Sequence, residues 1–203
     1  MPGHHAVIFD AFGTILQIKD GSHPFRRLLK EGVRQGRRPQ PDDAHILMTR
    51  PLSLEGAAEH FGIKISTQDL GALKYDLAEE VDRVEAFPDA LLAVQALQEA
   101  GIKVGVCSNL AMPYAAAISR LFPTLDAYTY SFALGAIKPD PLIYDDICQK
   151  LGAQPGRIHM IGDSQRCDKD GPCAIGIDGH WLSREGAGDF DDLLTFARMV
   201  IGQ

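Results

Sequence analysis

Residues 5–14 read HAVIFDAFGT, and this stretch decides the fold. It begins with a short, mostly apolar run, residues 5–9, that is rich in β-forming side chains. The run stops abruptly at Asp10, and Gly13 and Thr14 follow closely. The pattern predicts a buried strand that carries a carboxylate at its carboxyl end.

The segment after this strand changes to a helical pattern. Between residues 24 and 84, apolar side chains recur at spacings of three and four, as in Leu70, Leu73 and Leu77. Helix breakers within the segment predict about four helices. These breakers are Pro39, Pro41, Pro51 and Gly62. A small hairpin with its turn at Asp20-Gly21 is expected to precede the helices.

Beyond Pro88, predicted strands and helices alternate along the chain. The expected strands are residues 102–107, 128–132 and 157–161, with a short apolar stretch at 174–177. The expected helices are residues 89–100, 114–121, 141–151 and 190–201. Such alternation is typical of parallel strands with helices on both faces. The sequence therefore predicts an α/β fold with a doubly wound parallel sheet. Residues 1–20 and 86–203 would form its core domain, and residues 21–85 an inserted helical subdomain.

Composition and charge narrow the function classes. The 203 residues carry a net charge of −7, which argues against a nucleic-acid partner because a phosphate backbone requires a clustered basic face. No apolar run is long enough to span a membrane, and the first residues lack the pattern of a secretory signal. The four cysteines have no metal-ligand spacing, which favours reduced thiols. A cytoplasmic protein is the expectation.

Polar side chains follow the predicted strands at the points where those strands end. Asp10 follows the first strand, Ser108 and Asn109 the second, and Lys138 a later loop. Asp163 and Asp168 follow the strand at 157–161. In folds of this kind, ligands bind outside the carboxyl ends of the strands, so these side chains define the candidate site.

These residues resemble the sequence motifs of the haloacid dehalogenase superfamily. The first motif is Asp10-Ala11-Phe12-Gly13-Thr14, and Ser108-Asn109 is similar to the second. The third corresponds to Lys138-Pro139-Asp140-Pro141, and the fourth runs from Gly162-Asp163-Ser164 to Asp168. Each motif alone is weak evidence, but four in order at strand ends are strong. The resemblance implies that the helical insertion is a cap over the active site.

The resemblance also implies a role for each candidate residue. Asp10 would be a covalent nucleophile, and Lys138 would neutralise Asp10 and a bound anion. The Ser108 hydroxyl and the Asn109 N–H would bind phosphoryl oxygens, as a strand-to-helix turn can. Ala11 and Phe12 would complete the binding site for a small-molecule substrate.

A cation is expected among the three carboxylates, because Asp10, Asp163 and Asp168 would otherwise repel each other and a phosphate. Magnesium suits such an oxygen-rich site. By the resemblance, Asp10, Asp163 and the main-chain carbonyl of Phe12 would bind Mg²⁺ directly, and Asp168 more distantly.

One position departs from the family pattern. Most phosphatases of this superfamily have an acid two residues after the nucleophile, where it protonates the leaving group, and this chain has Phe12. General acid–base help is worth roughly two to four powers of ten in rate. Phe12 favours a dehalogenase, because cleavage of a carbon–halogen bond needs no proton donor.

Asp163 supports the opposite interpretation, because a metal-free dehalogenase has no cation for it to hold. A Mg²⁺-dependent phosphohydrolase acting on a small phosphorylated metabolite is therefore the main hypothesis, with a 2-haloacid dehalogenase as the alternative. A phosphonate-cleaving enzyme would need a cap lysine, for which Lys19, Lys30, Lys64 and Lys74 are the candidates. A binding or regulatory protein with weak catalysis is a further alternative. The sequence does not identify the substrate.

Overall fold

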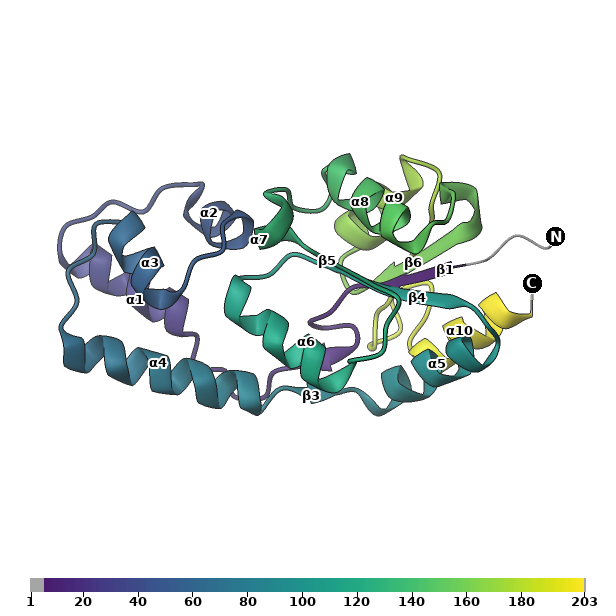
Figure 1. Cartoon of the computed structure of the whole chain (residues 1–203), viewed down its shortest axis with the longest axis horizontal. Helices are drawn as coiled ribbons and strands as arrows, with labels where there is room; N and C mark the ends of the chain where they lie inside the picture. Colours follow the sequence, from purple (N-terminus) through teal and green to yellow (C-terminus); the bar gives the residue numbers. More distant parts are fainter. Residues whose placement is uncertain (1–5, 203) are drawn as a thin grey trace.

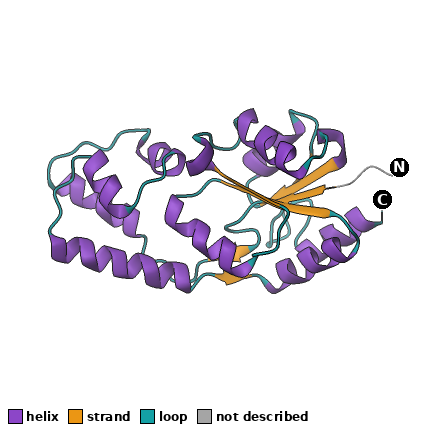
Figure 2. Cartoon of the chain, viewed as in Figure 1, coloured by secondary structure: helices purple, strands orange, loops and turns teal. Residues whose placement is uncertain are grey.

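A parallel β-sheet forms the centre of the computed structural model, which describes residues 6–202 (Figures 1 and 2). Five strands of this part of the chain pair in the order β5-β4-β1-β6-β7. They are β1 (Ala6–Phe9), β4 (Lys103–Ser108), β5 (Ala127–Tyr130), β6 (Ile158–Gly162) and β7 (Asp178–Trp181). β1 lies between β4 and β6, with Phe9 level with Val106 and Ile161. The predicted doubly wound α/β fold is confirmed.

Alternate residues of β1 supply two separate apolar cores, one on each face of the sheet. Val7 and Phe9 belong to the core under α5 (Pro88–Glu99), α6 (Ala115–Leu121) and α10 (Leu193–Ile201). Ala6 and Ile8 belong to the core under α8 (Pro141–Leu151). All four side chains are fully buried, because successive residues of a central strand point to opposite, covered faces.

The helical insertion is confirmed between two short strands, β2 (Leu16–Gln17) and β3 (Glu85–Ala86). It contains four helices among the described residues: α1 (Pro24–Arg34), α2 (Asp43–Thr49), α3 (Leu54–His60) and α4 (Thr67–Asp82). They share an apolar core of their own that includes Leu28, Leu54 and Leu73. Ser53 and Ser66 cap α3 and α4 by accepting N–H bonds from Gly56 and Asp69.

The predicted hairpin at Asp20-Gly21 is wrong. β2 pairs in antiparallel fashion with β3, so its partner comes from the far side of the helical insertion. Asp20 does take up a left-handed conformation, with φ at 54°, but it lies in the segment that leads into α1. The β2–β3 pair therefore joins the two places where the chain passes between the core and the insert.

Smaller differences occur towards the carboxyl end. The last strand is Asp178–Trp181, and the apolar stretch at 174–177 forms the turn between it and α9 (Gly171–Cys173). β5 ends at Tyr130, and the next residues form the short helix α7 (Ser131–Leu134). Residue 5, which the sequence placed in the first strand, lies outside the described residues.

The carboxyl ends of the strands face the helical insert (Figure 1). Between residues 6 and 202, no helix combines the length and apolar character needed to cross a membrane.

Candidate active site

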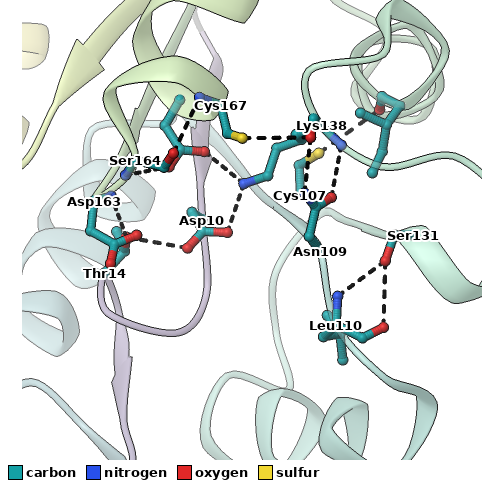
Figure 3. Close-up of polar contacts among 12 residues, drawn as sticks. Asp10, Thr14, Cys107, Asn109, Leu110, Ser131, Lys138, Asp163, Ser164 and Cys167 are labelled. Atoms are coloured by element: carbon teal, nitrogen blue, oxygen red, sulfur yellow. Dashed lines mark hydrogen bonds and ion pairs between the residues drawn. The ribbon is translucent and has the colours of Figure 1, made fainter. Parts of the chain in front are cut away.

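Four charged side chains from three distant parts of the sequence meet at the carboxyl edge of the sheet (Figure 3). The Nζ atom of Lys138 lies 2.6 Å from Oδ1 of Asp10 and 2.6 Å from Oδ1 of Asp168. Lys138 and Asp168 are nearly inaccessible, with exposed fractions of 3% and 1%, and Asp10 is buried as well. Asp163 stands beside them at the exposed side of the group. The structure thus brings these four predicted residues together.

The charges of this group do not cancel. Burial alone would lower the pKa of Lys138, but the carboxylates of Asp10 and Asp168 raise it well above its usual value. Partial burial and the negative charges of Asp10 and Asp168 raise the pKa of Asp163 to about 6. One ammonium group therefore faces three carboxyl groups, which leaves an excess of negative charge.

The arrangement of oxygens fits a hard divalent cation. Ligand atoms of Asp10, Asp163 and Asp168 all lie within 4.8 Å of one another. Carboxylate oxygens are the ligands that Mg²⁺ prefers, and a cation among them would offset their mutual repulsion. These residues can therefore hold Mg²⁺, and the main-chain carbonyl of Phe12 belongs to the same turn as Asp10.

Two glycines leave room for the carboxylates. A β-carbon at Gly13, whose φ is 86°, would lie 2.1 Å from Oδ2 of Asp163. A β-carbon at Gly162 would lie 2.3 Å from Cγ of Asp168 and 2.8 Å from Cβ of Asp10. No side chain larger than hydrogen fits at either position without moving a carboxylate.

We expect Gly162→Ala to disturb the site. The new methyl group must displace Asp168 or Asp10, so the free energy of unfolding should fall by roughly 1–3 kcal/mol and Mg²⁺ affinity should also fall. Gly71→Ala is the control, because open space surrounds a β-carbon there and the residue is in helix α4. Urea unfolding should show an unchanged or slightly more stable control. Equal stability of the two variants would contradict the crowding at Gly162.

Thr14 fixes the relative positions of Asp10 and Asp163. Its buried hydroxyl lies 3.4 Å from Oδ2 of Asp10 and accepts the main-chain N–H of Asp163 at 3.1 Å. The carbonyl of Ala11 accepts N–H bonds from Thr14, Ile15 and Leu16, which closes a tight turn after β1. The sequence placed Thr14 in the first motif but gave it no role.

Asn109 holds the loop that carries Lys138. Its side-chain oxygen accepts the main-chain N–H of Lys138 at 2.8 Å, and its side-chain nitrogen donates to the carbonyl of Lys138 at 3.1 Å. The sequence assigned a role only to the N–H of Asn109, which stays a prediction. Ser108, the last residue of β4, is 2% exposed and stands on the strand next to Asp10.

The fourth motif is held from two sides. The main-chain N–H of Ser164 donates to Oδ2 of Asp168 at 3.0 Å. On the other side, Nε1 of Trp181 donates to the carbonyl of Asp163 at 3.0 Å. Trp181 is the single tryptophan of the chain, so its fluorescence reports on the surroundings of Asp163.

Phe12 contacts the core rather than an acidic group. Its ring packs edge-on against Tyr114, with centroids 5.8 Å apart and planes at 83°. The hydroxyl of Tyr114 donates to Glu80 of helix α4 at 2.6 Å. Glu80 and Tyr114 were not singled out from the sequence.

The sequence model of the haloacid dehalogenase-like hydrolase family matches residues 4–171 of the chain. The chain therefore belongs to this family of hydrolases.

The curated relatives include both dehalogenases and phosphatases. (S)-2-haloacid dehalogenase 4A of Burkholderia cepacia is 30% identical over 59% of this chain, which spans about half (52%) of that relative. (S)-2-haloacid dehalogenase 1 of a Pseudomonas species is 26% identical, and the match covers 85% of this chain and 81% of the relative. A phosphatase of Mycobacterium tuberculosis is 27% identical, with 71% and 67% covered.

Solved structures share the fold over most of the chain. A phosphatase of this family from Thermococcus onnurineus has a TM-score of 0.69 at 21% identity, with 97% of both chains covered. A family member from Bacteroides thetaiotaomicron, solved with magnesium and inorganic phosphate, has a TM-score of 0.61 at 15% identity. That match covers 89% of this chain and 95% of the other.

Proposed function

We propose that the protein is a Mg²⁺-dependent phosphohydrolase that acts on a small phosphorylated molecule, with Asp10 as the nucleophile. The observation that carries this proposal is the group of three carboxylates, Asp10, Asp163 and Asp168, around a single buried lysine. An anionic substrate can approach such a group only when a cation offsets the excess negative charge. The magnesium and phosphate bound to the Bacteroides family member are consistent with this requirement.

The residues of the site divide the chemistry between them. A carboxylate oxygen of Asp10 attacks phosphorus, the bond to the leaving oxygen breaks, and water then cleaves the aspartyl phosphate to regenerate Asp10 and release phosphate. Lys138 holds Asp10 in place and balances part of its charge. Mg²⁺ held by Asp10, Asp163 and the Phe12 carbonyl, with Asp168 close by, would stabilise charge on the phosphoryl oxygens. Ser108 and the Asn109 N–H would bind those oxygens.

Phe12 narrows the range of substrates. A phenyl ring cannot donate a proton, so the leaving oxygen must depart as an anion or take its proton from water. Acyl and aryl phosphates, whose leaving groups are stable anions, should therefore react faster than alkyl phosphates.

Residues 21–85 are proposed to act as the cap. They lie opposite the carboxyl ends of the strands, where a lid can exclude water from the reaction (Figure 1). The partner is then a small molecule, and we propose a cytoplasmic location on the strength of the four free cysteines.

A haloacid dehalogenase is the second candidate, favoured by Phe12 and by the two relatives from Burkholderia and Pseudomonas. Of the four lysines that a phosphonate-cleaving enzyme could use, Lys19 and Lys74 form exposed ion pairs with Glu85 and Glu55. A panel of acyl phosphates, aryl phosphates and haloacids, each with and without Mg²⁺, separates the candidates. We expect phosphate release that depends on Mg²⁺. Metal-independent release of halide would overturn the proposal.

Metal binding itself can be measured without a substrate. Because Trp181 donates to the carbonyl of Asp163, Mg²⁺ should change its fluorescence in a saturable way. Asp163→Asn should raise the Mg²⁺ concentration that gives half of the fluorescence change by roughly tenfold or more. Asp178→Asn, which alters an exposed carboxylate in the same strand as Trp181, should respond like the wild type. An equal response to Na⁺ at matched ionic strength would contradict a specific site.

A further inference from the structure

A buried carboxylate lies where the helical insert meets the core. Glu80, near the end of α4, is 6% exposed and accepts three hydrogen bonds. Its Oε2 accepts from the Ser22 hydroxyl and from the His23 main-chain N–H, both at 2.8 Å. Its Oε1 accepts from the Tyr114 hydroxyl at 2.6 Å. One side chain of the insert thus joins the segment that leads into α1 to a turn of the core.

The protonation states of this cluster suit these bonds. Burial alone would raise the pKa of Glu80, but the hydrogen bonds from Tyr114, His23 and Ser22 lower it below its usual value. Burial and the contact with Glu80 raise the pKa of Tyr114 above its usual range. Glu80 therefore stays an acceptor and Tyr114 a donor. Tyr114 is consequently unsuited to replace the general acid that is missing at Phe12.

The segment that leads into the insert depends on Glu80. Asp20 and His23 have φ values of 54° and 50°, a left-handed conformation that residues other than glycine rarely adopt. His23 stands at the start of α1, where no side chain caps the helix, and its N–H donates to Glu80. The hydrogen bond holds an unfavourable backbone conformation in place.

The end of α4 is tied to the core by polar contacts beside a surface pocket. Nη2 of Arg120, in α6, donates to the carbonyls of Val81, Asp82 and Val84 at 3.0–3.1 Å. An open surface pocket of about 360 Å³ lies between α3, α4 and Pro113, the residue before Tyr114. Few apolar side chains cover this side of the junction, so hydrogen bonds such as that between Glu80 and Tyr114 contribute to its geometry.

The Tyr114 ring connects Glu80 to the active site. It packs edge-on against Phe12, which lies two residues after Asp10 in the turn that presents the nucleophile. We propose that Glu80 is a positioning residue: through Tyr114 it fixes Phe12 and the turn after Asp10, and so couples the placement of the insert to the site. The kinetic part of this inference rests on the proposed phosphohydrolase function.

Two conservative variants test the coupling. Tyr114→Phe keeps the ring against Phe12 but removes the donor to Glu80. Glu80→Gln keeps the shape, but its single side-chain oxygen cannot serve all three donors. Each variant should lower kcat/KM for an aryl phosphate by roughly tenfold. The double variant should lose less than the product of the two single effects, because both changes disturb the bond between Glu80 and Tyr114.

A control variant, Mg²⁺ titration and hydrogen exchange complete the test. Glu79→Gln is the control, because Glu79 is a neighbour on α4 that forms an exposed ion pair with Arg83. Mg²⁺ titration by Trp181 fluorescence should match the wild type in Glu79→Gln, but Tyr114→Phe and Glu80→Gln should need more Mg²⁺, because the Phe12 carbonyl is a proposed ligand. Hydrogen exchange should become faster at residues 12–16 and 20–23 in Tyr114→Phe and Glu80→Gln, but not in Glu79→Gln.

Hydrogen exchange and kinetics distinguish the coupling through Glu80 from the proposed phosphohydrolase function. If the wild type cleaves no phosphate ester, faster exchange at residues 12–16 in Tyr114→Phe still supports the coupling, and unchanged exchange there overturns it. If the wild type is active and both variants keep kcat/KM close to its value, the coupling to the active site is overturned. Glu80 would then be a structural residue of the junction.

Discussion

Replacing Asp10 with Asn should abolish phosphate release, with a fall in kcat of roughly three powers of ten or more. The amide of Asn is a poor nucleophile and cannot form the aspartyl phosphate. It also carries no charge, so Lys138 keeps Asp168 as its one close carboxylate partner. Steady-state rates with an aryl phosphate, measured in saturating Mg²⁺, check this result.

The matched control is Asp145→Asn, the same chemical change on the exposed side of helix α8. It should keep the wild-type rate. Circular dichroism of both variants should show a folded chain, so that lost activity reports on chemistry. An Asp10→Asn variant with more than a small fraction of wild-type activity would assign the nucleophile to another residue.

Local patterns predicted most of the fold. The five residues before Asp10 indicated the central strand, and Pro141 with Gly152 marked the ends of helix α8. The β2–β3 pair could not be predicted this way, because its two halves lie on opposite sides of the helical insert. Pairing between distant segments leaves no local signal, whereas Asp20-Gly21 carries the local signal of a turn that the chain uses differently.

The strand-end rule also located the charged part of the site. Asp10, Lys138 and Asp163 were expected at one edge of the sheet because parallel strands end together there. The sequence gives no comparable signal for Glu80. It stands beside Glu79 in a charged stretch of α4, yet Glu79 pairs with Arg83 at the surface and Glu80 is buried at the junction. Only tertiary packing distinguishes these two neighbours.

Introducing an acid at Phe12 should change the choice of substrate. Phe12→Asp places a carboxyl group where the family's phosphatases carry their proton donor, as the motif resemblance implies. Turnover of alkyl phosphates should rise, by roughly tens to thousands of times, within the range that general acids supply. Aryl phosphates should gain far less, because their leaving groups depart without a proton. The gain should therefore increase with the pKa of the leaving group across a series of esters.

The control is Phe12→Asn, which removes the same contact with Tyr114 and has nearly the same shape as Asp but cannot supply a proton. Any difference between the Asp and Asn variants then comes from acid–base catalysis rather than from lost packing. If the two variants cleave every ester at the same rate, the side chain at position 12 does not reach the leaving group. If the wild type also releases halide from 2-haloacids without Mg²⁺, the aromatic residue at position 12 belongs to a dehalogenase site instead.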